Sequence, residues 1–218
     1  MSRILYDLCA SNDQRFSPYC WRTKLALAHK GLDYETEPVR FTEKHKLEFS
    51  GQDKVPVLDD GGTVVNDSFA IAEYLDETYA DAPTLFPGTN GRHNAKLTHE
   101  WMDSQHRTIL SFIVLDVFGR LDGEDQAYFR PSREARYNKT LEQVQAGRDA
   151  AIDEFREISL ASLRVHIHDR PFISGDQPAY SDYIVFGTFQ WARLTSDFDL
   201  LAPDDALYAW RERMIARL

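Results

Sequence analysis

A serine hydroxyl at the start of a predicted helix is the feature of this sequence best placed to do chemistry. Ser17 precedes Pro18, and proline suits the first helical position because a helix start leaves that N–H group unpaired in any case. Gly31 suits the helix end, so a helix is predicted over residues 18–30. The free N–H groups and the dipole of a helix start favour negative charge, and the Ser17 hydroxyl could donate a hydrogen bond to an anion bound there. The same pattern is also typical of a simple helix cap that binds no ligand.

The elements around this serine are predicted to form a βαβ unit and then a hairpin. Residues 3–8 and 34–41 are predicted strands on either side of the helix and should pair in parallel. Residues 54–58 and 63–65 are short apolar runs around Asp-Asp-Gly-Gly, which predicts a β-hairpin. Pro56 cannot donate to a sheet, so we expect it at a strand end, and it is a candidate cis-proline.

Two amphipathic patterns should pack against these strands. On the first helix, Trp21, Leu25 and Ala28 share a predicted apolar face, and Arg22 should lie away from it. A second helix is predicted over residues 67–79, where an acidic residue and a serine stand at the start.

The rest of the chain is predicted to be helical. Residues 81–92 contain prolines and glycines typical of a linker, which divides the chain into domains at 1–80 and 93–218. A long helix with apolar spacing should follow the linker, and a second long helix is predicted over residues 132–163, broken or bent near Gly147. Residues 181–194 and 207–218 are predicted as two further helices. The fold class is therefore α+β.

Composition excludes several kinds of function. The net charge of −10 argues against nucleic-acid binding, which needs clustered Lys and Arg. We find neither a membrane span nor a signal peptide, and the two cysteines fit a reducing compartment, so a cytoplasmic protein is expected. The pairs His166/His168 and His99/His106 lack matching ligands, and no metal site is predicted.

Several short motifs give the chain a resemblance to a known family. The predicted order of elements resembles a thioredoxin-like domain (βαβ-ββα) followed by the all-helical domain of cytosolic glutathione transferases. The S-P-Y-C of residues 17–20 is similar to the redox motif C-P-Y-C with its first Cys replaced by Ser. Lys54-Val55-Pro56 is similar to the family's cis-proline strand, and Asp67-Ser68 to its acid-serine pair. The runs at residues 67–75 and 141–148 look most like the bacterial β-aryl-etherase branch.

The resemblance extends to a late capping motif at residues 175–182, with one departure. The family has Ser, Thr or Asn three residues before the Asp, whereas this chain has Ala179 before Asp182. Asp182 would remain to hold the helix start, and whether Ser181 compensates for the missing cap is left open. A missing side-chain cap costs about 1 kcal/mol of stability, and we expect the chemistry to be unchanged.

The resemblance implies glutathione as co-substrate, with Ser17 as the hydroxyl that stabilises its thiolate. Lowering a thiol pKa from ~8.5 by about two units requires about 2.7 kcal/mol. A charge-assisted hydrogen bond contributes about 1.5–3 kcal/mol and a helix start about 0.3–2 kcal/mol, which together suffice. Tyr6, at the end of the first strand, is the competing donor, since several transferase classes use a tyrosine there. Cys9 and Cys20 are expected to be packed thiols.

The rest of glutathione is placed by the same resemblance. Val55 would offer its backbone to the cysteinyl part, next to cis-Pro56. Ser68 and its helix start suit the γ-glutamyl carboxylate, and Asp67 suits the γ-glutamyl ammonium. Lys54 is the first candidate for the glycyl carboxylate. Further cationic candidates for that group are Arg40, Lys44, His45 and Lys46.

A hydrophobic electrophile would bind against the helical domain, with Trp101, Gln105, Phe112 and Ile113 as candidate wall residues. Detoxification by a cytoplasmic glutathione transferase is the function implied. Glutathione-dependent cleavage of aryl ethers and a non-catalytic ligand-binding module remain as alternatives. A homodimer is implied by the resemblance, with the first domain of one subunit against the helices of the other.

Overall fold

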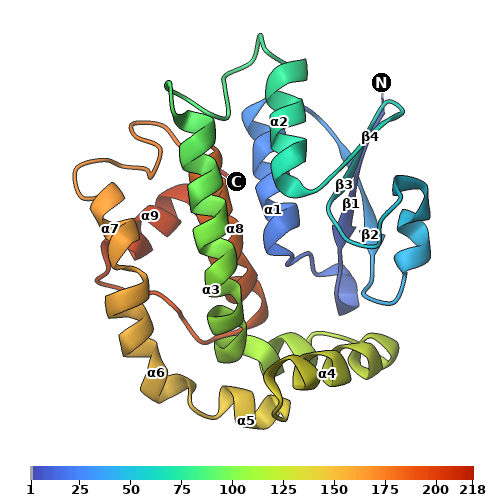
Figure 1. The fold of residues 1–218 in the computed structure, drawn as a ribbon, viewed down its shortest axis with the longest axis vertical. Helices are drawn as coiled ribbons and strands as arrows, with labels where there is room; N and C mark the ends of the chain where they lie inside the picture. The colour runs from blue at the N-terminus through green and yellow to red at the C-terminus, as the bar shows by residue number, and fades with distance from the viewer. Residues whose placement is uncertain (1) are drawn as a thin grey trace.

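A four-stranded mixed sheet forms the first part of the protein in the computed structural model, which describes residues 2–218 (Figure 1). The strands are β1 (Arg3–Leu8), β2 (Glu35–Val39), β3 (Val57–Asp60) and β4 (Thr63–Asn66), in the order β2-β1-β3-β4. β1 pairs in parallel with β2 and antiparallel with β3, and β3 and β4 form the hairpin. The predicted βαβ unit and hairpin are therefore confirmed, as is the α+β class.

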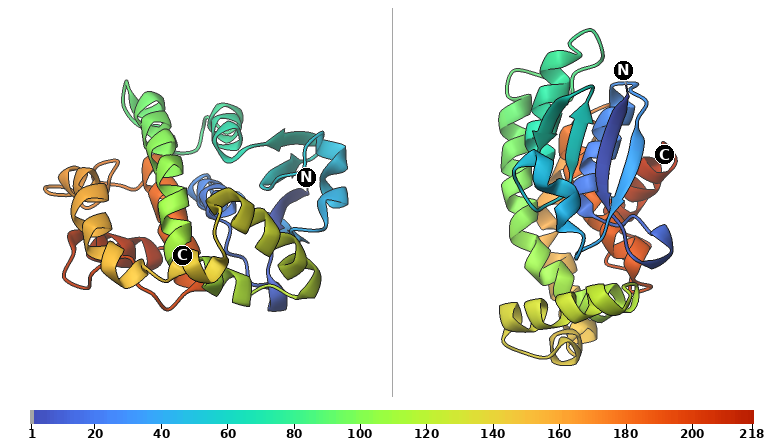
Figure 2. Two further views of the ribbon diagram at one scale, coloured as in Figure 1. Left: turned by 60° about the horizontal axis from the view of Figure 1, so that its bottom comes forward. Right: turned by 90° about the vertical axis from the view of Figure 1, so that its right-hand side faces the viewer.

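Two helices, α1 (Pro18–His29) and α2 (Ser68–Thr78), lie between the sheet and the helical domain (Figures 1 and 2). A short 3₁₀ helix, Lys44–Ser50, follows β2. The connection 79–90 then leads from α2 into the first helix of the second domain.

The second domain is helical throughout. Its elements are α3 (Gly91–Gly119), α4 (Gly123–Tyr137), α5 (Leu141–Gln145), α6 (Arg148–Glu154), a π-helical turn (Phe155–Ser159), α7 (Ala161–His166), α8 (Tyr180–Thr195) and α9 (Ala206–Ile215). α8 is buried on nearly all sides and packs against both α1 and α3. The start of α1 is thus fixed from both domains. No helix among residues 2–218 is long and apolar enough to cross a membrane.

The single long helix predicted over residues 132–163 is wrong. Asn138 adopts a left-handed conformation (φ 53°) that ends α4, and Thr140 caps α5 by accepting from the N–H of Gln143. Gly147 then stands at the start of α6. The interruption near Gly147 agrees with the prediction. The apolar spacing is similar on both sides of Asn138, so periodicity alone did not reveal the break there.

The predicted outward orientation of Arg22 is also wrong. Its side chain is fully buried, whereas Ala28 on the predicted apolar face is exposed. The reason is tertiary: α1 packs against both α8 and α2, so more than one face is buried. Close approach at this contact depends on Gly187 of α8, because a Cβ there would lie 2.5 Å from the carbonyl oxygen of Pro18.

Candidate active site

A cavity of about 740 Å³ lies between the sheet domain and the helical domain. Its lining brings together most of the residues that the sequence proposed for glutathione: Ser17, Lys54, Val55, Pro56, Asp67 and Ser68. These residues come from the start of α1, the segment before β3 and the start of α2.

Ser17 is the N-cap of α1 and is only 3% exposed. Its Oγ accepts a hydrogen bond from the N–H of Cys20 at 3.3 Å. Because the hydroxyl acts there as an acceptor, its own proton remains available to a group in the cavity. The site therefore offers one O–H donor at a helix start, where an anion is favoured.

The start of α2 supplies a second set of polar groups. The carboxylate of Asp67 accepts from the N–H groups of Phe69 and Ala70 at 2.9 and 3.1 Å, and Asp67 itself has φ 72°. Ser68 is 1% exposed, and its Oγ has no hydrogen-bond partner among residues 2–218. A buried hydroxyl is costly to leave unpaired, so a ligand group in the cavity would satisfy it. Tyr180 of α8 holds this helix start by donating to the carbonyl of Ser68 at 2.5 Å.

The peptide bond between Val55 and Pro56 is cis, which confirms the prediction for this proline. Lys54 is exposed beside it and lines the cavity. Arg40 and Lys44 also line the cavity, but both are ion-paired, Arg40 with Asp122 and Lys44 with Asp53.

The other two cationic candidates lie elsewhere. Lys46 pairs with Glu37 and Glu43 at 3.2 and 3.1 Å and is not part of the described lining. His45 is exposed and is likewise outside that lining. Among the candidates for the glycyl carboxylate that line the cavity, Lys54 is therefore the one whose charge is not already paired with a carboxylate of the described residues.

Tyr6, the alternative thiolate donor, is not among the lining residues. Its ring packs against Phe49 with centroids 4.8 Å apart, in the small cluster of Leu47 and Val57. Leu5 belongs instead to the main core, as expected from the alternation of side chains along β1. Burial, followed by the charge of Asp59, raises the pKa of the Tyr6 phenol. Ser17 is thus the candidate donor that the fold brings to the cavity.

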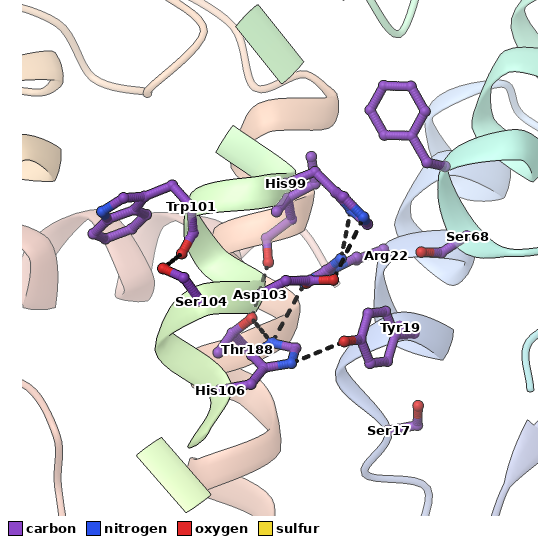
Figure 3. Close-up of polar contacts among 12 residues, drawn as sticks. Ser17, Tyr19, Arg22, Ser68, His99, Trp101, Asp103, Ser104, His106 and Thr188 are labelled. Carbon is purple, nitrogen blue, oxygen red and sulfur yellow. Dashed lines mark hydrogen bonds and ion pairs between the residues drawn. The ribbon is translucent and has the colours of Figure 1, made fainter. Parts of the chain in front are cut away.

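The residues predicted to line the second-substrate site need correction. Trp101, Gln105 and Phe112 lie outside the lining, as does Ile113. Figure 3 shows Trp101 on the side of α3 away from Ser17 and Tyr19. Phe112 is 2% exposed and packs against Phe155 and Phe198.

The cavity face of α3 carries His106, Arg107 and Leu110 instead. The error is one of helical phase: a shift of two positions along a helix turns the side chain by about 200°. Nothing in the amphipathic pattern distinguishes the face that meets α8 from the face that meets the cavity.

A buried polar network that the sequence did not reveal joins α1, α3 and α8 beside the cavity (Figure 3). The Arg22 guanidinium donates to His99 Nδ1 at 2.9 Å and to Asp103 Oδ1 at 3.1 Å. The Tyr19 hydroxyl lies 3.0 Å from His106 Nδ1, and His106 Nε2 lies 3.1 Å from Thr188 Oγ1. Asp103 falls four residues after His99, and that spacing was the available signal.

Protonation states in this network follow from burial. Burial, and then the charge of Arg22, lowers the pKa of His106 to about 4, so its imidazole is neutral at pH 7. Burial, and then Asp103, raises the pKa of Tyr19 to about 12. Neutral His106 has one ring N–H, so one ring nitrogen donates and the other accepts. Its partners are the Tyr19 hydroxyl at Nδ1, and Thr188 Oγ1 and the Arg22 guanidinium at Nε2, the latter at 3.5 Å.

The two cysteines are buried, and burial raises the thiol pKa of each. Cys20 is fully buried one turn into α1. A buried thiol with a raised pKa is a poor nucleophile, so neither cysteine is suited to attack a substrate. Within residues 2–218, no group of three or more His, Cys, Asp or Glu side chains is arranged to hold a metal.

Comparison with known proteins identifies the family. Residues 16–78 match the model of the glutathione S-transferase N-terminal domain, and residues 95–210 match the model of the glutathione S-transferase C-terminal domain. The chain belongs to the glutathione S-transferase family. Glutathione S-transferase U28 of Arabidopsis thaliana is 27% identical over 208 residues, which cover 92% of this chain and 81% of that protein. The similarity of this chain to proteins named glutathione S-transferase supports a glutathione transferase activity.

A shorter match relates the chain to a probable maleylacetoacetate isomerase of Vibrio cholerae, 40% identical over 94 residues and covering 40% of each protein. The glutathione transferase GSTFuA3 from Phanerochaete chrysosporium has the same fold, with a TM-score of 0.82 at 25% identity, over 100% of this chain and 97% of that one. The transferase CsGST63524 of Ceriporiopsis subvermispora, solved in complex with glutathione, shares the fold with a TM-score of 0.76 at 22% identity, over 100% and 96% of the two chains.

Proposed function

We propose that this glutathione transferase uses the Ser17 hydroxyl to stabilise the glutathione thiolate, which then attacks an electrophile held between the two domains. The observation that carries the proposal is the orientation of Ser17. Its Oγ accepts from the N–H of Cys20 and lines the cavity, so its proton is available to sulfur. This is a serine-type site, the kind that the resemblance to β-aryl etherases implies.

The same geometry supports the placement of the whole tripeptide. The unpaired Ser68 Oγ and the start of α2 suit the γ-glutamyl carboxylate, and Asp67 suits its ammonium. The backbone of Val55, next to cis-Pro56, would pair with the cysteinyl part, and Lys54 would bind the glycyl carboxylate. Donors and acceptors then match the tripeptide along its length.

In the proposed reaction, the sulfur lone pair forms a bond to the electrophilic carbon and the leaving group departs with its bonding pair. Ser17 remains a hydrogen-bond donor throughout and forms no covalent bond. No general base is needed, because a thiolate with a lowered pKa is already present at pH 7.

Substitution Ser17→Ala tests this role. We expect the pKa of bound glutathione to rise by about two units and kcat/KM with chlorodinitrobenzene to fall about 100-fold, because the thiolate loses a charge-assisted hydrogen bond. Thiolate absorbance in the ultraviolet as a function of pH measures the first quantity, and steady-state conjugation measures the second.

Ser17→Thr, which keeps a hydroxyl, and Tyr6→Phe are the matched controls. The proposal is wrong if Ser17→Ala leaves sulfur acidity and turnover unchanged, or if Tyr6→Phe causes the larger loss. Tight glutathione binding without any turnover would favour the ligand-binding module, and turnover of an aryl ether would favour ether cleavage.

We also infer a cytoplasmic homodimer with a role in detoxification. Two exposed apolar side chains support the dimer: Phe49 of the sheet domain is 50% exposed and Leu97 of the helical domain is 52% exposed. Contact of one domain with the other domain of a second copy would bury both. Light scattering during size exclusion should give twice the chain mass of 25.1 kDa.

A further inference from the structure

The helical side of the cavity carries three arginines, Arg107 of α3 and Arg133 and Arg136 of α4. None of the three forms an ion pair with a carboxylate among residues 2–218. The chain has 35 acidic and only 25 basic residues, so carboxylates are abundant overall. Asp53, Asp67 and Asp103 line the same cavity, but they contact Lys44, the start of α2 and Arg22. Among residues 2–218 the three arginines therefore have no carboxylate at ion-pair distance, which indicates that a ligand supplies the negative charge.

Arg133 is the most constrained of these arginines. Its guanidinium lies over the rings of Phe129 and Phe41, at 4.3 and 5.3 Å from their centroids. Its Nη1 donates to Ser132 Oγ at 2.8 Å, and its Nε is buried with no hydrogen-bond partner in the described chain, residues 2–218. Burial and the neighbouring charge of Arg136 lower its pKa, so the folded protein contains a cation that an anion would stabilise.

Arg107 and Arg136 likewise have no carboxylate at ion-pair distance among residues 2–218. Arg107 donates to the carbonyl of Arg136 at 3.1 Å and lies over the ring of Tyr137. A carbonyl oxygen satisfies a donor without neutralising its charge. The planar guanidinium fork matches a carboxylate with two parallel hydrogen bonds.

The surfaces beside the arginines are flat and apolar. Phe41, Leu110, Tyr128, Phe129 and Trp191 line the same cavity. Phe41 packs against both Tyr128 and Phe129, with centroids 6.2 and 5.7 Å apart. Such walls suit an aromatic body, while the polar groups proposed for glutathione belong to the sheet domain.

We propose that the second substrate is an aromatic electrophile that carries a carboxylate, bound by Arg133 together with Arg107 and Arg136. This inference rests on the proposed function for the position of the reacting thiolate. It narrows the substrate class from any hydrophobic electrophile to an aromatic acid.

Binding is tested without turnover, by isothermal titration calorimetry of dinitrobenzoate and its methyl ester with S-methylglutathione present. The acid should bind at least tenfold more tightly than the ester, and Arg133→Met should reduce this acid-to-ester ratio at least tenfold. Arg136→Met provides a second variant at a more exposed position. Arg217→Met is the matched control, since Arg217 also lies over an aromatic ring, that of Phe172, and lies outside the cavity lining.

Equal affinity for acid and ester would overturn the proposal, as would a ratio that Arg133→Met and Arg136→Met leave unchanged. A loss of glutathione affinity in these variants, with the ratio preserved, would assign the arginines to glutathione and also overturn it.

Turnover of a chlorodinitrobenzoate and its methyl ester separates this inference from the proposed function. The thiolate would form a carbon–sulfur bond at the ring carbon that bears chlorine, and chloride would leave with the bonding pair. Conjugation of neither compound would refute the proposed function, while the calorimetric ratio still decides the anion site. Conjugation of both, with kcat/KM favouring the acid and the preference lost in Arg133→Met, is the expected result.

Discussion

The start of α8 differs from the starts of α1 and α2 in what its polar groups contact, although all three have the backbone geometry of a helix start. At α8, Asp182 is fully buried and accepts from the N–H groups of Ile173, Ser174 and Ala179 at 2.8, 3.0 and 3.2 Å, and from Trp210 Nε1 at 2.9 Å. At α1 and α2, the hydroxyls of Ser17 and Ser68 retain unused capacity toward a cavity.

This difference separates structural from ligand-binding helix starts. A polar group whose partners all belong to the protein contributes to folding, whereas a buried group without partners is stabilised only when a ligand arrives. Substitutions at α8 should therefore change stability and those at α1 and α2 should change activity. The comparison fails if a single substitution changes stability and activity to a similar degree.

Removing the Asp182 carboxylate should have the largest effect on stability. Asp182→Ala leaves buried donors unpaired in the loop before α8 and in α9, so we expect the free energy of unfolding to fall by about 4 kcal/mol. Urea denaturation followed by circular dichroism measures it.

Asp176→Ala is the control, because Asp176 is exposed in the same segment. Where Asp182→Ala remains folded, kcat/KM per folded molecule should stay within about threefold of wild type. A folded variant with a hundredfold loss of activity would contradict the assignment of α8 to structure.

His106 of α3 lies between the two regions, since it contacts Tyr19 in the first turn of α1 and Thr188 in the middle of α8. Its pKa is lowered from 6.5 to about 4, so between these pH values the unfolded chain binds a proton that the folded chain does not. Stability is therefore lost as the pH falls through this window, by about 3 kcal/mol.

The variant His106→Asn should remove this part of the pH dependence, measured as thermal stability between pH 7 and pH 4. His45→Asn, at an exposed position, should leave the change of thermal stability with pH as it is in wild type. If thermal stability changes with pH identically in wild type and His106→Asn, the pKa of His106 is not lowered as its burial requires.

Removing the unpaired hydroxyl of Ser68 should have the smallest effect. Ser68→Ala removes no bond within the protein, so the free energy of unfolding should change by less than about 1 kcal/mol. KM for glutathione should rise about tenfold with little change in kcat, because the lost contact is made to the co-substrate before and during reaction.

Ser111→Ala on α3 is the matched control, since the Ser111 hydroxyl donates to the carbonyl of Thr108 and lies outside the cavity lining. Unchanged glutathione kinetics in Ser68→Ala would remove α2 from the proposed binding site.

The local features of the glutathione side could be predicted because they depend on neighbours in the chain. Pro18 and Gly31 bracket α1, the Asp-Asp-Gly-Gly turn makes the hairpin, and the position of Pro56 suggested its cis bond. Even the departure at Ala179 was visible, although its expected cost did not anticipate that Asp182 accepts from donors in the preceding loop and in α9.

The helical side could not be predicted in the same way. The sequence indicated a long helix that includes Trp101 and Phe112, but which face meets the cavity depends on how α3 packs against α8. The break at Asn138 and the burial of Arg22 were missed as well, whereas the interruption near Gly147 was predicted.

By itself, then, the sequence determined the order of elements, the two capped helix starts that offer Ser17 and Ser68, and the family. Only the tertiary structure decided that Ser17 rather than Tyr6 reaches the cavity, and that Arg107, Arg133 and Arg136 gather there with no carboxylate partner in the described part of the chain, residues 2–218. The physical reason is the separation along the chain of the residues that interact. Caps and turns are formed by residues a few positions apart, whereas burial and the pairing of charges depend on segments that meet only when the domains pack.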